Sequence, residues 1–72
     1  MSTLRLANRL KVARAERNLS QEELAKLVGV TRQTISSIET GQYCPSALLA
    51  FLLAQRLDKP VDKLFYLDGG EP

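Results

Sequence analysis

Apolar residues recur at helical spacing in two neighbouring stretches of this chain, which a single glycine separates. In residues 21–28 they cluster on one side, and in residues 32–39 Ile35 and Ile38 mark a second apolar side. Gly29 can adopt the left-handed backbone conformation that ends a helix without a steric penalty. The pattern predicts two short helices that cross at a steep angle.

Both stretches also begin at residues that cap helices. Ser20 is followed three residues later by Glu23, which is the spacing of a capping box, and Thr31 is a good N-cap for the second helix. Because each helix has its own start signal and Gly29 supplies a stop, residues 20–40 have the sequence form of a helix-turn-helix.

The second of these helices has a polar face opposite its buried face. With Ile35 and Ile38 pointing inward, Gln33 and Ser37 point outward. Ser36 and Thr40 lie beside them, and Arg32 flanks the first turn. In the major groove, glutamine can pair with adenine and arginine with guanine through two hydrogen bonds each. The residues from 31 to 38 include no acid that would repel phosphate, so this face is either ordinary solvated surface or a DNA-reading surface, and the motif around it favours DNA.

Three further apolar stretches predict helices and complete an all-α domain. They run from about Leu6 or Ala7 to Arg17, from Ala47 to about Leu57, and from about Val61 to Phe65. Ser46 caps the second of them. We expect one domain over residues 1–72, with a core at about 8–65 and a tail at 68–72 that frays.

The loop after the helix-turn-helix is a candidate for contacts to the DNA backbone. Gly41 ends the preceding helix and Pro45 blocks its continuation. We expect Gln42 and Tyr43, through side chains and backbone amides, to hold phosphates.

One ion pair can be expected between distant helices. Arg14 lies one turn after Leu10, close to the buried side of its helix, and Glu39 follows Ile38 at the rim of the reading helix. A partly buried arginine needs an acidic partner. We therefore expect Arg14 and Glu39 to lock the first helix onto the third.

The fourth predicted helix is apolar on nearly all sides. Leu48, Phe51 and Leu52 lie largely outside its inward face. Because a chain of 72 residues has only one small core, the second apolar side predicts contact with another molecule.

Composition narrows the choice of chemistry. The net charge is only +2, although basic residues crowd the first segment and acids lie late. Cys44 is the only cysteine and there is no histidine, so the sequence predicts no disulfide, no metal site and no cofactor. Neither a nucleophile with its base nor a membrane-spanning run is present, which argues against an enzyme and favours a cytoplasmic protein.

Taken together, these segments resemble the Cro/Xre-type helix-turn-helix regulators, which include the lambda repressor-like proteins. The resemblance covers about Asn8 to Phe65, through NRLKVARAERNLSQEELAKLVGVTRQTISSIETGQYCPS and the closing VDKLF. It implies a compact five-helix domain that binds double-stranded operator DNA as a homodimer. Some short relatives also pair their terminal strands, which residues 4–6 and 65–67 could do here. Asp58 departs from the family, since glycine is common at that position.

The resemblance also implies roles for individual residues. Gln21 would contact a phosphate and brace Gln33. The expected DNA-binding residues are Gln21, Arg32, Gln33, Thr34, Ser36, Ser37, Gln42 and Tyr43. The family has a structural ion pair at the positions of Arg14 and Glu39. The expected dimer interface consists of Leu48, Phe51, Leu52 and Phe65.

The main hypothesis is a sequence-specific transcriptional regulator, a repressor that occupies a palindromic operator. An alternative is the antitoxin of a toxin–antitoxin pair, in which the apolar surface would bind a partner protein. A third is a protein-interaction module that does not bind DNA, for which an acidic or apolar recognition face would be expected.

Overall fold

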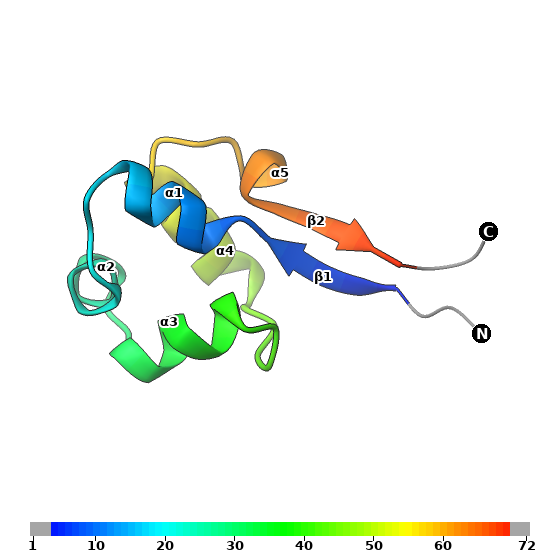
Figure 1. Ribbon diagram of the computed structural model, residues 1–72, viewed down its shortest axis with the longest axis horizontal. Helices are drawn as coiled ribbons and strands as arrows, with labels where there is room; N and C mark the ends of the chain where they lie inside the picture. Colours follow the sequence, from blue (N-terminus) through cyan, green and yellow to red (C-terminus); the bar gives the residue numbers. More distant parts are fainter. Residues whose placement is uncertain (1–3, 70–72) are drawn as a thin grey trace.

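A computed structural model describes residues 4–69 as five helices and a two-stranded antiparallel ribbon (Figure 1). Along the chain the elements are β1 Arg5–Asn8, α1 Leu10–Glu16, α2 Gln21–Val28, α3 Arg32–Glu39, α4 Ala47–Arg56, α5 Val61–Leu64 and β2 Phe65–Asp68. The five-helix prediction and the terminal ribbon are both confirmed. Most of the predicted frayed tail lies outside the described residues, whereas Asp68 at its start belongs to β2.

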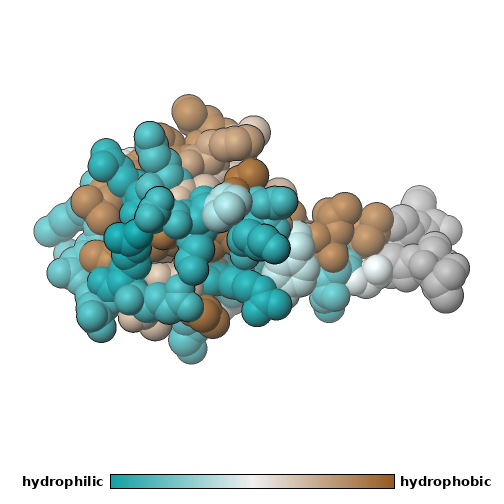
Figure 2. All heavy atoms as spheres, turned by 90° about the horizontal axis from the view of Figure 1, so that it is seen from above, coloured by the Kyte–Doolittle hydropathy of each residue, from teal (hydrophilic) through white to brown (hydrophobic). Residues whose placement is uncertain are grey.

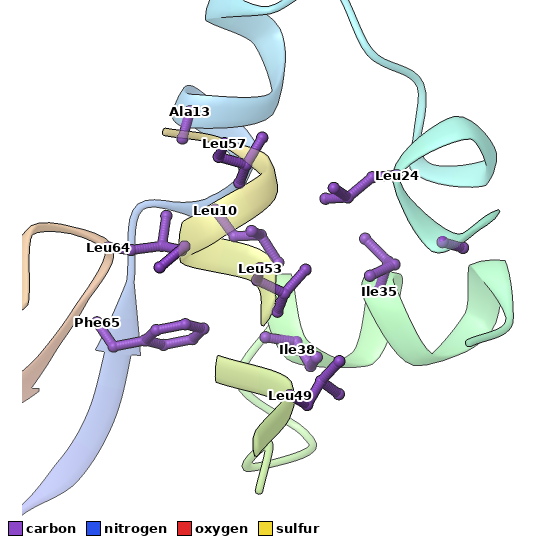
Figure 3. Close-up of a cluster of buried hydrophobic side chains, with 12 residues drawn as sticks. Leu10, Ala13, Leu24, Ile35, Ile38, Leu49, Leu53, Leu57, Leu64 and Phe65 are labelled. Atoms are coloured by element: carbon purple, nitrogen blue, oxygen red, sulfur yellow. The ribbon is translucent and has the colours of Figure 1, made fainter. Parts of the chain in front are cut away.

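The helices surround one apolar core. Side chains from every helix converge there, and Figure 3 shows Leu24 of α2 and Ile35 of α3 on one side, with Leu64 and Phe65 on the other. The largest fully buried side chains are Leu10, Leu24, Ile35, Ile38, Leu53, Leu57 and Leu64. Because all five helices contribute to this cluster, each helix has its orientation fixed by burial of its apolar side.

The predicted signals that start and stop α2 and α3 are present. Ser20 Oγ accepts a hydrogen bond from the backbone N–H of Glu23 at 3.0 Å, and the Glu23 carboxylate accepts one from the Ser20 N–H at 2.8 Å. The bond from the Ser20 N–H favours the charged carboxylate and lowers the pKa of Glu23. Gly29 is left-handed with φ 79°, and Thr31 accepts from the backbone N–H of Thr34 at the start of α3.

Helix α1 begins later than the sequence predicts. It starts at Leu10 instead of Leu6 or Ala7, because residues 5–8 pair with β2. Asn8 ends the strand and starts the helix: its Oδ1 accepts from the backbone N–H of Leu10 at 3.0 Å. Its Nδ2 donates to the carbonyl of Ile38 at 2.9 Å, which ties this junction to the last turn of α3.

The ribbon extends from one end of the helical body (Figure 1). Arg5 pairs with Asp68 and Asn8 with Phe65, so Phe65 belongs to the strand and not to the last helix. Figure 2 shows hydrophobic side chains on the ribbon, where Tyr66 and Leu67 are exposed. Arg9 lies over the Tyr66 ring, 5.6 Å from its centroid, and this contact joins the ribbon to α1.

The turn after α4 has an aspartate, Asp58, where glycine is common in the family. The backbone there still adopts the left-handed conformation that glycine favours. Asp58 has φ 55°, in the left-handed region that aspartate tolerates better than most residues. Its backbone N–H donates to the carbonyl of Gln55, and its carboxylate lies 3.3 Å from Arg17.

Removing the Asn8 amide should weaken the whole domain, because two partly buried backbone groups, the Leu10 N–H and the Ile38 carbonyl, lose their partner. Asn8→Ala should lower the free energy of unfolding by about 1–2 kcal/mol. For a domain of this size each kcal/mol corresponds to a fall in Tm of roughly 4–8 °C, measurable by circular dichroism.

Asn18→Gly is a suitable control, because it removes another asparagine side chain at a position with φ 56° that glycine adopts easily. Equal Tm values for Asn8→Ala and wild type would show that the amide has no structural role.

Candidate nucleic-acid interface

Helix α3 is held on its inner side and exposed on its outer side. In Figure 1, α2 is seen nearly end-on while α3 runs across the view along the edge of the helical body. The small side chain of Ala25 is 2% exposed, so the two helices approach closely at this point. Ile35 and Ile38 expose at most 1% of their surface. The steep crossing expected from the sequence is therefore present.

The outer side of α3 presents hydrogen-bonding groups. Arg32 and Gln33 are exposed, whereas Thr34, Ser36 and Ser37 are partly buried. The first turn of α3 contains no acid, and Glu39, the only acid of the helix, has a side chain only 6% exposed. The face therefore carries no accessible carboxylate that would repel a polyanion.

Arg14 and Glu39 form an ion pair between α1 and α3. Arg14 Nε donates to Glu39 Oε2 at 2.8 Å and Arg14 Nη2 donates to Glu39 Oε1 at 3.3 Å. Arg14 Nη1 also donates to the carbonyl of Leu19 at 2.8 Å, just before α2. The two charged side chains therefore connect three parts of the chain: helix α1, helix α3 and the segment that precedes α2.

Gln21, at the start of α2, extends this connection to the first turn of α3. Its Nε2 donates to Glu39 Oε1 at 3.0 Å, and its Oε1 accepts from Arg32 Nη1 at 3.5 Å. The expected brace between Gln21 and Gln33 is replaced by these two contacts, because Glu39 and Arg32 lie on either side of the amide.

The loop after α3 uses its backbone amides internally. Gly41 has φ 81°, and the N–H groups of Gln42 and Tyr43 donate to the carbonyl of Ser37 at 2.9 and 3.1 Å. These two amides therefore have partners within the chain, and their expected contact with phosphates stays a prediction. The side chains of Gln42 and Tyr43 are exposed and can still reach a ligand.

Several of the predicted DNA-binding residues line one shallow hollow between α3 and the start of α4. It has a volume of about 370 Å³ and brings together Val30, Gln33, Thr34, Ser37, Tyr43 and Leu49. Gln21 and Arg32 lie outside it, towards α2. The candidate interface thus has an arginine at one end and a half-apolar recess at the other.

The expected dimer residues fall into two groups. On α4, Leu48 is 71% exposed and Phe51 61%, while Leu52 is partly buried. Phe65 is only 7% exposed and belongs to the core of its own chain. We therefore leave Phe65 out of the candidate interface, because it has almost no surface to offer a partner.

The described residues contain neither a candidate metal-binding cluster nor a candidate membrane-spanning helix. Between residues 4 and 69, no three histidine, cysteine, aspartate or glutamate side chains gather as ligands for an ion. In the same range, the helices are too short or too polar to cross a bilayer.

Sequence reasoning missed two contacts that position α3. The amide of Asn8 holds the carbonyl of Ile38, and the carbonyl of Leu19 holds Arg14. The bond from the Leu10 N–H to the Asn8 side chain is local, but the second partner of that side chain lies thirty residues away and leaves no local signal.

Comparison with known proteins agrees with this geometry. A helix-turn-helix family model matches residues 10–64. The chain is 46% identical over 66 residues to an HTH-type transcriptional regulator of Methanocaldococcus jannaschii, covering 92% of this chain and all of the relative. It is 41% identical over 63 residues to a Bacillus subtilis protein of the same description, covering 88% and 96% of the two chains.

Among solved structures, the restriction-modification controller protein C.AhdI from Aeromonas hydrophila superposes with a TM-score of 0.72 and 36% identity. The match covers 76% of this chain and 80% of C.AhdI. The chain therefore belongs to the helix-turn-helix family, and its fold is that of a DNA-binding domain.

Breaking the ion pair from one side should destabilise the domain strongly. Arg14→Met leaves the Glu39 carboxylate buried without its cation, which costs about 3–5 kcal/mol in comparable buried pairs. The free energy of unfolding in urea measures this loss.

The double variant Arg14→Met/Glu39→Met removes both charges and should recover much of that stability. A double variant no more stable than Arg14→Met would show that the stability lost does not come from an uncompensated charge.

Proposed function

We propose that this protein is a sequence-specific DNA-binding transcriptional regulator that acts as a homodimeric repressor. The observation that carries the proposal is the outer side of α3, which is exposed, rich in hydrogen-bonding groups and held by a buried ion-pair network. Relatives that match along nearly their whole length are described as HTH-type transcriptional regulators, which supports the same role.

In the proposed complex, the start of α3 enters the major groove. Gln33 and Ser37 read base edges, and Arg32 and Thr34 lie at the entrance with Ser36 beside them. Gln21 on one side and Gln42 with Tyr43 on the other contact the flanking backbone. The absence of accessible acids on this side of α3 favours such an approach.

The proposed dimer uses the exposed apolar side of α4. Leu48 and Phe51 expose most of their side chains to water, with Leu52 beside them, and burying them against a second copy would be favourable. A two-fold dimer places two reading helices on one face of the DNA. Half-sites about 34 Å or 10 bp apart, related as a palindrome, would then be occupied together.

Repression follows from occupancy of a promoter, so the proposal requires neither catalysis nor a cofactor. The protein would act in the cytoplasm, where bacterial and archaeal DNA is found.

The role of Gln33 can be tested with an operator selected from random DNA by the wild-type protein. Gln33→Ala should weaken binding to this operator by about 1–3 kcal/mol and relax specificity at one base pair. Fluorescence anisotropy with a labelled duplex measures both effects.

Asn18→Gly is the matched control, since it removes an exposed amide that lies outside both α3 and α4. If Gln33→Ala and Asn18→Gly bound the selected operator equally well, Gln33 would not be a base reader. If the wild type selected no sequence at moderate salt, the proposed function itself would be wrong.

The dimer can be tested separately. Phe51→Glu places a charge in the proposed interface and should give a monomer in sedimentation equilibrium, with operator binding weakened at least tenfold, because each half-site alone binds weakly. The variant should keep the helical circular dichroism spectrum of wild type, because Phe51 is exposed in the monomer.

A wild type that stays monomeric while it saturates the operator would contradict the homodimer. The Leu48 and Phe51 surface would then be assigned to a different protein, as the antitoxin hypothesis requires.

A further inference from the structure

We propose that the terminal ribbon and the outer side of α4 form one apolar surface, which a second copy of this chain covers. The side of the ribbon that carries Leu4, Leu6 and Leu67 is called the ribbon face below. This inference rests on the homodimer of the proposed function and adds to its interface a part of the chain that lies outside α4.

The pairing of the two strands determines which side chains share a side of the ribbon. Residues directly opposite each other in an antiparallel ladder point to the same side, and neighbours along a strand point to opposite sides. Leu6 pairs with Leu67, so both belong to the ribbon face, and Leu4 joins them by alternation. Ala7 pairs with Tyr66. The three leucines therefore lie on one side of the ribbon, and Tyr66 lies on the other.

The ribbon face is continuous with the hydrophobic core. Phe65 lies two residues before Leu67, and therefore on the same side of β2, and it is buried among the side chains of the helices (Figure 3). Farther along the ribbon, Leu67 is 67% exposed and Leu4 is 51% exposed. The apolar side thus begins inside the domain and continues beyond the helices, where the described part of the chain leaves it exposed to water.

The ribbon face and the outer side of α4 point in the same direction. In Figure 1, α4 lies behind α1, and the back of that view is the upper side of Figure 2. Hydrophobic atoms gather along this upper side, both over the helical body and on the ribbon (Figure 2). On α4 the exposed large apolar residues are Leu48 and Phe51. One partner can therefore cover both surfaces at once.

The apolar area on α4 alone is small for a stable dimer. Leu52 is already partly buried, so with Leu48 and Phe51 it offers on the order of 300–400 Å² per protomer, at about 200 Å² for a large apolar side chain. Stable interfaces bury about 800 Å² on each partner. The ribbon face adds apolar area on the same side of the molecule, chiefly through Leu67 and Leu4.

The chemistry of the ribbon face fits a second copy of the same surface. Within residues 4–69 this face has no charged side chain, because Arg5 and Asp68 pair on the other side, 3.9 Å apart. A polyanion would require cations here. In a two-fold dimer the same patch occurs on both protomers, so an apolar surface meets an apolar surface. A second copy therefore matches the ribbon face and α4 together.

The first test compares two neighbouring residues on opposite sides of the ribbon. Leu67→Glu places a charge in the proposed contact and should raise the dimer dissociation constant at least about tenfold in sedimentation equilibrium. Tyr66→Glu is the matched control, because it adds the same charge one residue away on the other side, and it should change this constant by no more than about twofold. Both residues are exposed, so both variants should keep the helical circular dichroism spectrum of wild type.

A second measurement avoids a disruptive charge. In a Cys44→Ser background, Leu67→Cys and Tyr66→Cys each provide one thiol, since Cys44 is the only cysteine of the chain. A maleimide should label Leu67→Cys at least about fivefold more slowly at protein concentrations above the dimer dissociation constant than below it, because reaction requires access to the thiol. Tyr66→Cys should react at the same rate at both concentrations.

Two results would overturn the inference. In the first, Leu67→Glu and Tyr66→Glu dimerise equally tightly. In the second, the labelling rate of Leu67→Cys does not change with protein concentration. If Phe51→Glu still gave a monomer, either result would restrict the interface to α4 and leave the proposed homodimer in place. Failure of the proposed function is a different observation, namely a wild type that selects no DNA sequence.

Discussion

The carboxylate of Glu39 is the group on which the arrangement of this domain depends. It lies at the carboxyl end of α3, where the helix dipole disfavours a negative charge, and burial penalises it further. Arg14 makes the position tolerable by donating two hydrogen bonds to it. Since α1 and α3 meet through this pair, and α2 joins it through Gln21, the tilt of α3 depends on a contact made on the inner side of the helix.

The sequence predicted those parts of the fold that depend on near neighbours. The caps at Ser20, Thr31 and Ser46 each act on a residue three positions away, and the left-handed turn at Gly29 follows from one residue. The start of α1 was predicted wrongly because residues 5–8 pair with a strand some sixty residues later. Local propensity carries no information on such long-range pairing. The leucine and alanine at positions 6 and 7 are good helix formers, so the local sequence favoured a helix there.

At the candidate site, too, the features that depend on near neighbours were predicted and those that depend on distant contacts were not. Helical periodicity placed Gln33 on the outer side of α3, where it is exposed. It could not show that Gln21 would contact Glu39 and Arg32, since these contacts depend on how two helices cross. Phe65 was expected at a surface and lies in the core, because β2 turns its first residue inward.

The ribbon has a mechanical consequence. Arg5 and Asp68 face each other at its tip, and the strands run antiparallel towards the core. A force that separates these two residues loads the ladder bonds one after another from the tip inward. Tension on the chain is therefore relieved by unzipping three residue pairs before it reaches the pair of Asn8 with Phe65 and the helices behind it.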